Sequence, residues 1–580
     1  MRPRLTFSLA LTLAACPGGS TTSDSAASGA SETSSAATTQ GTGSTGDPTG
    51  PDPSTSSTGD PPTTGGTTGD PTTQGPTTDP TDTTGPDPGP LVEPGDPGPG
   101  DVTFEIRADQ DRRPISPWIY GINEIEDLHT TQRGVGLVRQ GGNRMTAYNW
   151  ENNASNAGSD YLHQNDDYLE WKLGVDGDIP GEVVRVPTAE ALAAGADMLV
   201  TIPICGYVAA DKNGGGDVIQ TPNYLQARFH PTIARKNAPF ADPPDLDDDA
   251  VYQDEFVAWL MGQFPDAFAG DPARILFSLD NEPDLWSSTH ARIHPDPVGY
   301  AELVDKNIEF AAAIKDLAPN ALVTGFVSYG YYGYITLQDA PDAQGEFITY
   351  YLQRMAAAEA DAGKRLVDVL DLHWYSEVYA NGQRITGDDT SQASIDARVQ
   401  APRSLWDPTY HEDSWIANDF IQGPVRLIPW LRERIDAHYP GTGIGFTEYN
   451  YGGGGHISGA IAQADVLGIF GREGVVLANY WPLSDQTAMI WAAMRAYTSY
   501  DGRGARFGDT SIRAVTSDIA ATSVYASTDA ADPARTVIVA INKTPAPLTA
   551  AVTLAAYADY KSVDVWQLTD AGPDLLPAAP

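Results

Sequence analysis

The sequence predicts an α/β protein, in which a (β/α)8 TIM-type barrel carries an accessory β-sandwich and follows a disordered linker. Between residues 113 and 509, eight apolar runs alternate with helical patterns, which is the element count of a closed (β/α)8 barrel. From 510 to 580, short strand-like runs follow one another without helices between them, a pattern typical of an all-β domain. Before residue 101 the composition cannot build a packed core.

The first sixteen residues have the pattern of a secretory signal. Arg2 and Arg4 precede an apolar run over 5–15, which is too short to span a bilayer as a helix. The ending LAAC is similar to the lipobox of bacterial lipoproteins, which would make Cys16 the lipidated first residue of the mature protein. The alternative is an ordinary cleaved signal. We expect a secreted protein, lipid-anchored at the bacterial cell envelope or surface.

Residues 17–100 consist mostly of Ser, Thr, Gly, Pro and Asp, contain no Lys or Arg, and repeat the tetrapeptide TGDP. Such a segment buries too little apolar surface to offset its ordering entropy, so we predict a disordered linker. The whole chain has a formal net charge of −42, which argues against nucleic acid or anionic lipid as a partner. We expect a monomer that meets a membrane only through Cys16.

The eight candidate barrel strands are apolar runs bounded by turn residues. They lie at 118–124, 136–143, 197–208, 273–280, 321–329, 367–375, 443–449 and 475–482. Helix candidates between them include 249–264, 297–317, 346–361, 418–438, 460–471 and 487–500. Because barrel enzymes carry their functional residues at the C-terminal ends of the strands, the candidate functional side chains are those at these ends.

The accessory domain is predicted from two separate parts of the chain. Short strand candidates lie at 519–527, 535–543, 550–554 and 562–568, and a further one precedes the barrel at 102–107. We therefore predict that 101–112 and 510–580 together form the β-sandwich.

Two glutamates follow the fourth and seventh predicted strands. Glu282 lies in LDNEPDLW (279–286), and Glu448 lies in IGFTEYNY (444–451). Asn-Glu-Pro alone is short enough to be an ordinary loop, but the paired positions place two carboxylates on opposite sides of one barrel mouth. Glycoside hydrolysis needs such a pair, and a separation of about 5 Å predicts retention of the anomeric configuration.

Other side chains at the predicted strand ends fit a glycan-binding cleft, since flat aromatic rings stack on the apolar faces of pyranoses. The tryptophans on this side of the barrel are Trp150, Trp286, Trp374, Trp415 and Trp481. Polar residues at inward strand ends are Arg139, Asn143 and His373. As a group we expect these polar residues to contact sugar or carboxylate, although any one alone could be a satisfied barrel residue.

The segments that carry these residues resemble glycoside hydrolase family 44. The resemblance extends through 101–580 and rests on the motifs at 139–160, 278–295, 371–377 and 447–465. It implies a barrel with a β-sandwich and retaining cleavage of β-1,4-glucans, including xyloglucan. It also implies that Glu282 is the acid/base and Glu448 the nucleophile, and it favours substrate contact for Trp415 and Trp481.

Two neighbours of these glutamates gain a role from this assignment. Asn281, beside the acid/base, is placed to hydrogen-bond the sugar 2-OH, where contacts strengthen in the transition state. Tyr449 either orients Glu448 and the substrate or simply packs in the barrel wall.

We expect that the chemistry requires no cofactor, and the sequence has no Cys/His set with zinc spacing. The acidic run at 245–249 precedes a predicted helix. It could hold calcium through Asp247 and Asp249, because calcium prefers oxygen ligands, or it could complement the helix dipole. Members of the family carry a structural divalent ion, so the resemblance adds support for calcium and leaves both alternatives open.

The sequence therefore predicts a retaining endo-β-1,4-glucanase or xyloglucanase. A mannanase or xylanase on the same barrel is an alternative, because substrate choice depends on loop contacts. A surface lipoprotein that binds glycan without cutting it is another, but it would not need both glutamates.

Overall fold

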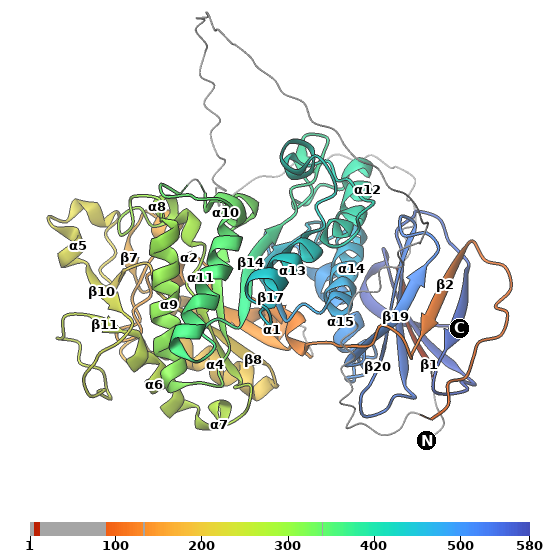
Figure 1. Cartoon of the computed structure of the whole chain (residues 1–580), viewed down its shortest axis with the longest axis horizontal. Coiled ribbons are helices and arrows are strands. Elements are labelled where there is room, and N and C mark those ends of the chain that lie inside the picture. The colour runs from red at the N-terminus through yellow and green to blue at the C-terminus, as the bar shows by residue number, and fades with distance from the viewer. Residues whose placement is uncertain (1–4, 12–88, 131–133, 339, 580) are drawn as a thin grey trace, which may run out of the picture. The chain divides into compact units, whose positions relative to one another are not determined.

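The computed structural model describes residues 5–11, 89–130, 134–338 and 340–579. Eight parallel strands close a barrel in chain order, with the last strand paired to the first. Figure 1 shows several of them among the surrounding helices. They are β4 (Gly121–Ile122), β5 (Leu137–Gln140), β8 (Asp197–Ile202), β12 (Ile275–Leu279), β13 (Val323–Ser328), β14 (Val369–Tyr375), β17 (Gly443–Asn450) and β18 (Leu477–Tyr480). Each lies within a predicted run or extends one residue past it, which confirms the barrel.

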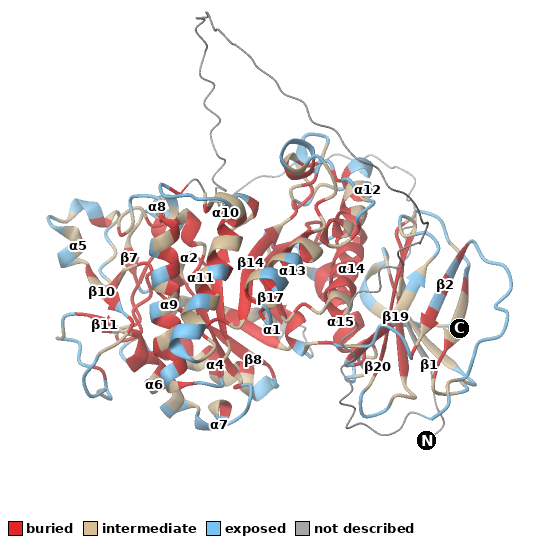
Figure 2. Ribbon diagram, viewed as in Figure 1, coloured by how far each residue is buried: buried red, intermediate tan, exposed pale blue. Residues whose placement is uncertain are grey.

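The strands are short apolar segments because they are covered on both faces. Every residue of β12 and β13 is buried, and the labelled barrel strands β14 and β17 are mostly buried as well, in red in Figure 2. Apolar side chains at or near the strand starts form a separate core cluster around Leu137, Leu199, Leu276, Val369 and Leu477. This cluster fills the N-terminal end of the barrel, which leaves its polar interior to the C-terminal end.

The larger helices are α4 (Glu182–Ala194), α6 (Gln253–Gln263), α9 (Tyr300–Leu317), α11 (Phe347–Ala362), α13 (Leu427–His438), α14 (Ile457–Glu473) and α15 (Ala488–Thr498). The predicted helix bounds are shifted by up to four residues, and two predicted helices differ most from the structure. The one at 249–264 starts later, because Val251–Tyr252 forms strand β11. The one at 418–438 is divided into a π-helical turn, η6 (Ile416–Ile421), and α13, since Gly423 and Pro424 interrupt it.

The accessory β-sandwich combines β2 (Val102–Arg107) with β19 (Thr510–Thr516), β20 (Thr522–Thr528), β21 (Thr536–Asn542), β22 (Ala550–Ala555), β23 (Val563–Thr569) and β24 (Gly572–Ala578). As predicted, the N-terminal strand joins the C-terminal segment, since β2 pairs with β19 and β22. Phe104 and Ile106 alternate with exposed residues along β2. They pack with Ile512, Val524 and Ile538 into a core of their own.

The start of the ordered domain differs from the predicted boundary at residue 100. Val92 pairs with Ala556, and Glu93 forms an ion pair with Arg107, so the fold already includes part of the segment 89–100. The rest of the predicted linker, up to residue 88, lies outside the described residues.

Residues 5–11 of the predicted signal segment form β1 (Leu5–Leu11), which pairs with β21 and β23. Cys16 lies outside the described residues, and the signal and anchor stay predictions. Among the described helices, none is long and apolar enough to cross a membrane.

A buried ionic contact joins the barrel to the sandwich. The Lys543 Nζ atom, at the end of β21, lies 2.6 Å from Oδ2 of Asp465 on α14, and both side chains are 1% exposed. The hydroxyl of Tyr525 on β20 donates to Asp465 Oδ1 at 2.6 Å. Charges removed from water in this way are tolerated only when they are paired.

Replacing Lys543 with Met leaves the Asp465 carboxylate buried without its counter-charge. We expect this variant to lose roughly 3–5 kcal/mol of unfolding free energy, measured by chemical denaturation. The control is Lys561→Met, which removes an exposed lysine paired with Asp559 on the same domain and should stay within about 0.5 kcal/mol of wild type. Equal stability of the two variants would contradict a structural role for the buried pair.

Candidate active site

The two glutamates of the sequence motifs meet at the C-terminal mouth of the barrel. Glu282 follows β12, the fourth barrel strand, and Glu448 lies within β17, the seventh. One carboxylate oxygen from each, together with a nitrogen of His373, lie within 4.8 Å of one another. A carboxyl pair this close matches retaining glycosidases rather than inverting ones, which keep the pair about 6.5–9.5 Å apart to admit a water.

Glu448 is held by two donors. Arg139 Nη1 donates to its Oε1 at 2.8 Å, and the Tyr375 hydroxyl donates to its Oε2 at 2.6 Å. Burial, the largest influence, raises the pKa of Glu448. The charges of His373 and Arg139 and the hydrogen bonds outweigh burial, so the pKa of Glu448 lies below its ordinary value. The carboxylate is therefore ionised and fixed in direction.

His373 lies between the two glutamates. Its Nδ1 is 2.9 Å from Glu282 Oε1 and 3.5 Å from Glu448 Oε2, and the Tyr334 hydroxyl donates to its backbone carbonyl. Burial lowers the pKa of His373, but the charge of Glu448 and the hydrogen bond with Glu282 raise it, and the net change is upward. The imidazole thus lowers the repulsion between the two carboxyl groups.

The backbone around Glu282 is strained. Asp280 (φ 69°), Glu282 (φ 43°) and Val327 (φ 62°) all adopt left-handed conformations, which are unfavourable for residues with a Cβ atom and notably so for valine. Glu282 N donates to Val327 O at 2.9 Å. The buried Asp280 carboxylate accepts from the backbone N–H groups of Ile204 and Cys205. These bonds fix a conformation that aims Glu282 across the barrel mouth.

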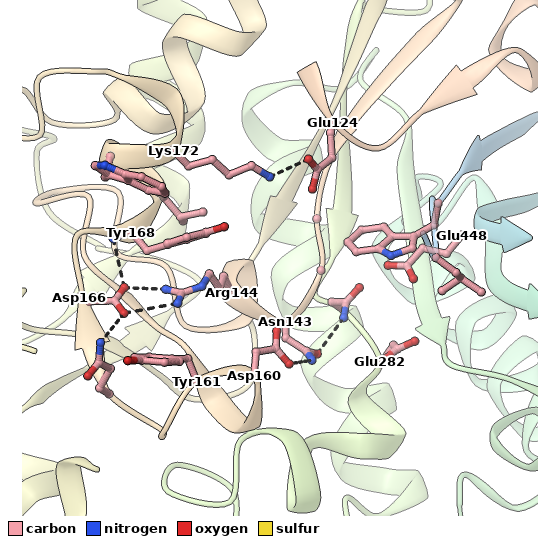
Figure 3. A pocket seen from close by; sticks show the side chains of 18 of the residues that line it. Glu124, Asn143, Arg144, Asp160, Tyr161, Asp166, Tyr168, Lys172, Glu282 and Glu448 are labelled. Carbon is pink, nitrogen blue, oxygen red and sulfur yellow. Dashed lines mark hydrogen bonds and ion pairs between the residues drawn. The ribbon is translucent and has the colours of Figure 1, made fainter. Parts of the chain in front are cut away.

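A cavity of about 980 Å3 opens beside the two glutamates (Figure 3). The loop after β5 and the segment around α3 (Tyr168–Leu173) form its wall. Ion pairs between Lys172 and Glu124 and between Arg144 and Asp166 brace this wall. The aromatic side chains of this wall, Tyr161, Tyr168 and Trp171, are exposed, most strongly Trp171 at 75%.

A second cavity of about 390 Å3 shares Tyr375 and Leu483 with the first and contains Trp415. The Trp415 ring stacks on Tyr332 with centroids 4.4 Å apart and an interplanar angle of 11°. Its indole N–H donates to Glu377 at 3.1 Å. Because Tyr375 also contacts Glu448, polar and aromatic surfaces continue on both sides of the glutamates, as a long chain-like ligand requires.

Several predicted site residues lie together here. Asn281, Asn143 and Trp481 line the larger cavity. The Asn281 amide donates to Asn143 Oδ1 at 3.4 Å and its carbonyl accepts from Arg139. Arg139 and His373 are fully buried beneath the cavity, so they contact the carboxylates rather than a ligand.

Four predicted ligand contacts are corrected by the structure. Trp150 is buried against Phe256. Trp286, the first residue of helix α8 (Trp286–Thr289), is fully buried. The Trp374 indole borders the second cavity but is 2% exposed. Tyr449 is buried in the barrel wall, where its hydroxyl accepts a bond from Gln463 on α14, so packing is its role.

Sequence reasoning missed several residues of the cleft. Tyr375 was detectable, because it lies two residues after His373 on β14 and alternate strand residues share a face. Trp171 and Tyr332 gave no such signal, since they lie on a short helix and a loop-borne helix, α10 (Tyr331–Thr336), whose positions depend on the whole fold.

The predicted calcium ligands Asp247 and Asp249 are both exposed. Between them, Asp248 is half-buried, and its Oδ1 has no hydrogen-bond partner within the described residues. Glu151 is buried and its Oε1 also lacks a partner there. Burial, with the charges of Asp248 and Glu255, raises the pKa of Glu151 to about 8.

A close carboxylate pair at a barrel mouth, in a cleft with aromatic walls, defines a glycoside hydrolase. The model of glycoside hydrolase family 44 matches residues 154–378. Endoglucanase A of Paenibacillus lautus is 45% identical over 82% of this chain and 68% of its own length. The β-mannanase/endoglucanase A of Caldicellulosiruptor saccharolyticus is 43% identical over 76% of this chain and 34% of its own length.

Among solved structures, a Paenibacillus polymyxa xyloglucanase bound to xyloglucan is 40% identical, with a TM-score of 0.74, over 83% of this chain and 94% of its own. An endoglucanase from Clostridium thermocellum is 39% identical, with a TM-score of 0.72, over 83% and 95%. The chain belongs to glycoside hydrolase family 44.

Removal of the Tyr375 hydroxyl directly tests whether its hydrogen bond lowers the pKa of Glu448 and supports catalysis. Removing one hydrogen bond to an ionised group costs about 1.5–3 kcal/mol, so Tyr375→Phe should lower kcat roughly 10- to 100-fold. Since that bond lowers the Glu448 pKa, its loss should shift the acid limb of the pH–kcat/KM profile to higher pH.

The matched control is Tyr449→Phe, whose hydroxyl bonds to Gln463 away from the cleft. We expect its kcat and its acid limb to stay close to wild type. An unmoved acid limb in Tyr375→Phe would contradict the role assigned to Tyr375.

Proposed function

We propose that this protein is a retaining, endo-acting hydrolase of β-1,4-glucans, with xyloglucan or cellulose-type glucan as its substrate. The observation that carries the proposal is the close pair of Glu282 and Glu448 within a cleft that extends on both sides of it. Relatives named as xyloglucanase and endoglucanase support the choice of polymer.

Glu448 acts as the nucleophile in this proposal. Its ionised carboxylate attacks the anomeric carbon, while Glu282 gives its proton to the departing glycosidic oxygen. This step leaves a covalent glycosyl–enzyme and a free new chain end. Glu282 then takes a proton from water, which attacks the same carbon and releases the sugar with its original configuration.

The neighbours of the pair support these roles. Arg139 and Tyr375 keep Glu448 ionised and oriented. When the glycosyl bond forms, the negative charge on Glu448 that both residues contact decreases. Asn281, held by Arg139 at 2.7 Å, is placed to hydrogen-bond the sugar 2-OH, where such contacts strengthen in the transition state. Trp415 and Trp481 offer rings for stacking on pyranose faces.

An alternative substrate is mannan or xylan. It is favoured by relatives named as a β-mannanase/endoglucanase and as a bifunctional glucanase-xylanase, the latter 28% identical with a TM-score of 0.63. The two glutamates serve any of these polymers, so discrimination rests on the cleft walls.

Reducing-end release from xyloglucan, carboxymethylcellulose, glucomannan and xylan tests the proposal, with Glu448→Gln as the inactive comparison. We expect the highest activity on a glucan and a fall of at least about 1,000-fold in the variant, because no nucleophile remains. Endo action predicts that viscosity falls early, before much reducing sugar is released. If the folded protein releases no reducing ends from any of the four polymers, a glycan-binding lipoprotein is favoured instead.

We also propose that calcium binds through Glu151 and Asp248. Both present a buried oxygen atom without a described partner, and hard oxygen ligands suit calcium. Lys236 Nζ lies 3.1 Å from Asp248 Oδ2 and 2.8 Å from Glu255, so some of the local negative charge is already compensated. When bound, the ion would stabilise the loop before α6, away from the two catalytic carboxylates.

Chelation provides the test of this calcium site. We expect EDTA to lower the Tm of the wild type and added calcium to restore it, since a ligand of the native state stabilises it. Asp248→Asn and Glu151→Gln should lose this response, whereas Asp247→Asn should keep it because Asp247 is exposed. A Tm unaffected by EDTA would contradict the proposal. Loss of the response only in Asp247→Asn would indicate that the exposed acids of 245–249 bind the ion instead.

Finally, we propose that Cys16 is lipidated and that the chain is held at the outside of a bacterial membrane. The LAAC ending of the apolar leader supports this. Labelling with an alkyne fatty acid in a bacterial host should mark the wild type and leave Cys16→Ser unlabelled. Equal labelling of both, or of neither, would contradict the anchor.

A further inference from the structure

A third cavity lies between the barrel and the β-sandwich and has a volume of about 470 Å3. It shares no lining residue with either cavity of the catalytic cleft. Its lining comes from β19 and β20, from the segment at 111–113 that pairs with β19, and from Trp406 and the end of α14. We call it the arginine cavity, after its lining residues Arg112, Arg113, Arg472 and Arg513.

The charge of this cavity is opposite to that of the protein. The chain has a formal charge of −42, yet the lining holds four arginines against the two acids Asp111 and Glu473. Positive charge concentrated in a concave, partly desolvated site attracts small anions.

Three of the four arginines are already engaged. Arg112 Nη1 donates to the backbone carbonyl of Ala108 at 2.8 Å. Arg513 contacts Asp111 at 3.2 Å and Glu105 at 3.4 Å. Arg472 Nε donates to Glu473 Oε1 at 2.8 Å, and its guanidinium lies 4.0 Å from the centre of the Trp406 ring. Its Nη2 is buried and has no acceptor among the described residues, so this arginine is only partly satisfied.

Arg113 is the unsatisfied cation of the cavity. It is half-buried, and within the described part of the chain its guanidinium has no hydrogen-bond or ion-pair partner. Burial lowers the pKa of Arg113, and the like charges of Arg432 and Arg472 lower it further, against the opposing charge of Glu473. A planar guanidinium in this position is a ready donor fork for an oxyanion.

We propose that the arginine cavity binds a small oxyanion through the guanidinium of Arg113, with Arg112 and Arg472 beside it. The ligand chemistry is a phosphate, sulfate or carboxylate group, delivered either as a free inorganic ion or as the acid group of an anionic sugar. A bound oxyanion would offset the mutual repulsion of the arginines and link the barrel to the sandwich. The proposal is independent of the activity assigned to the glutamates.

Isothermal titration of the full folded chain at constant ionic strength tests the proposal, with sodium phosphate, sodium sulfate and sodium glucuronate as ligands and glucose as the neutral comparison. We expect saturable binding of at least one anion, no binding of glucose, and a Tm rise of about 1–2 °C at saturation. Tighter binding of phosphate or sulfate identifies an inorganic ligand, whereas tighter binding of glucuronate identifies an acidic sugar.

Arg113→Gln should weaken the binding at least 10-fold. Arg113→Lys, which keeps the charge but loses the fork, should fall between it and wild type. The control is Arg354→Gln, which removes an exposed arginine paired with Asp305 on the barrel and should leave binding unchanged. Glucan hydrolysis by each variant verifies folding. Absence of binding by all three anions, or equal binding in Arg113→Gln and wild type, would overturn the proposal.

Discussion

The active site depends on one buried cation, the guanidinium of Arg139. It is fully buried on β5 and donates to Asn123, Asn281 and Glu448, which belong to the segments at β4, β12 and β17. A buried charge is costly unless it is paired with an opposite charge and hydrogen-bonded by its neighbours. Arg139 is therefore stable only when these strand ends are in register, and this same register brings the two catalytic carboxyl groups together.

The charges around the glutamates form a balanced set rather than independent pairs. Arg139 and Tyr375 hold Glu448 ionised, while His373 contacts both carboxyl groups. Left-handed backbone at Glu282, fixed by the buried Asp280, completes the arrangement. Strain and buried charge at this point are compensated by the apolar cluster that fills the opposite end of the barrel.

Much of this could be predicted from the sequence, because barrel strands are short apolar runs and the two glutamates follow the fourth and seventh of them. The direction of side chains beyond the strand ends could not. Trp150 and Trp286 are of the residue type that stacks on sugars, but both indole rings are buried in the core. Trp171 and Tyr332, which are exposed in or beside the cleft, lie on short elements whose position depends on the assembled fold. The same limitation affected the acidic run at 245–249, where the buried oxygen belongs to Asp248 and its neighbour Glu151 comes from a distant loop.

The central claim is that Glu282 and Glu448 act by double displacement. Proton NMR of the reducing ends formed in the first minutes from a β-1,4-linked gluco-oligosaccharide measures this most directly, because mutarotation has not yet mixed the anomers. The account predicts that the β-anomer is released first and that the α-anomer follows only as mutarotation proceeds. Initial release of the α-anomer would show inversion and would contradict the assignment of Glu448 as a nucleophile.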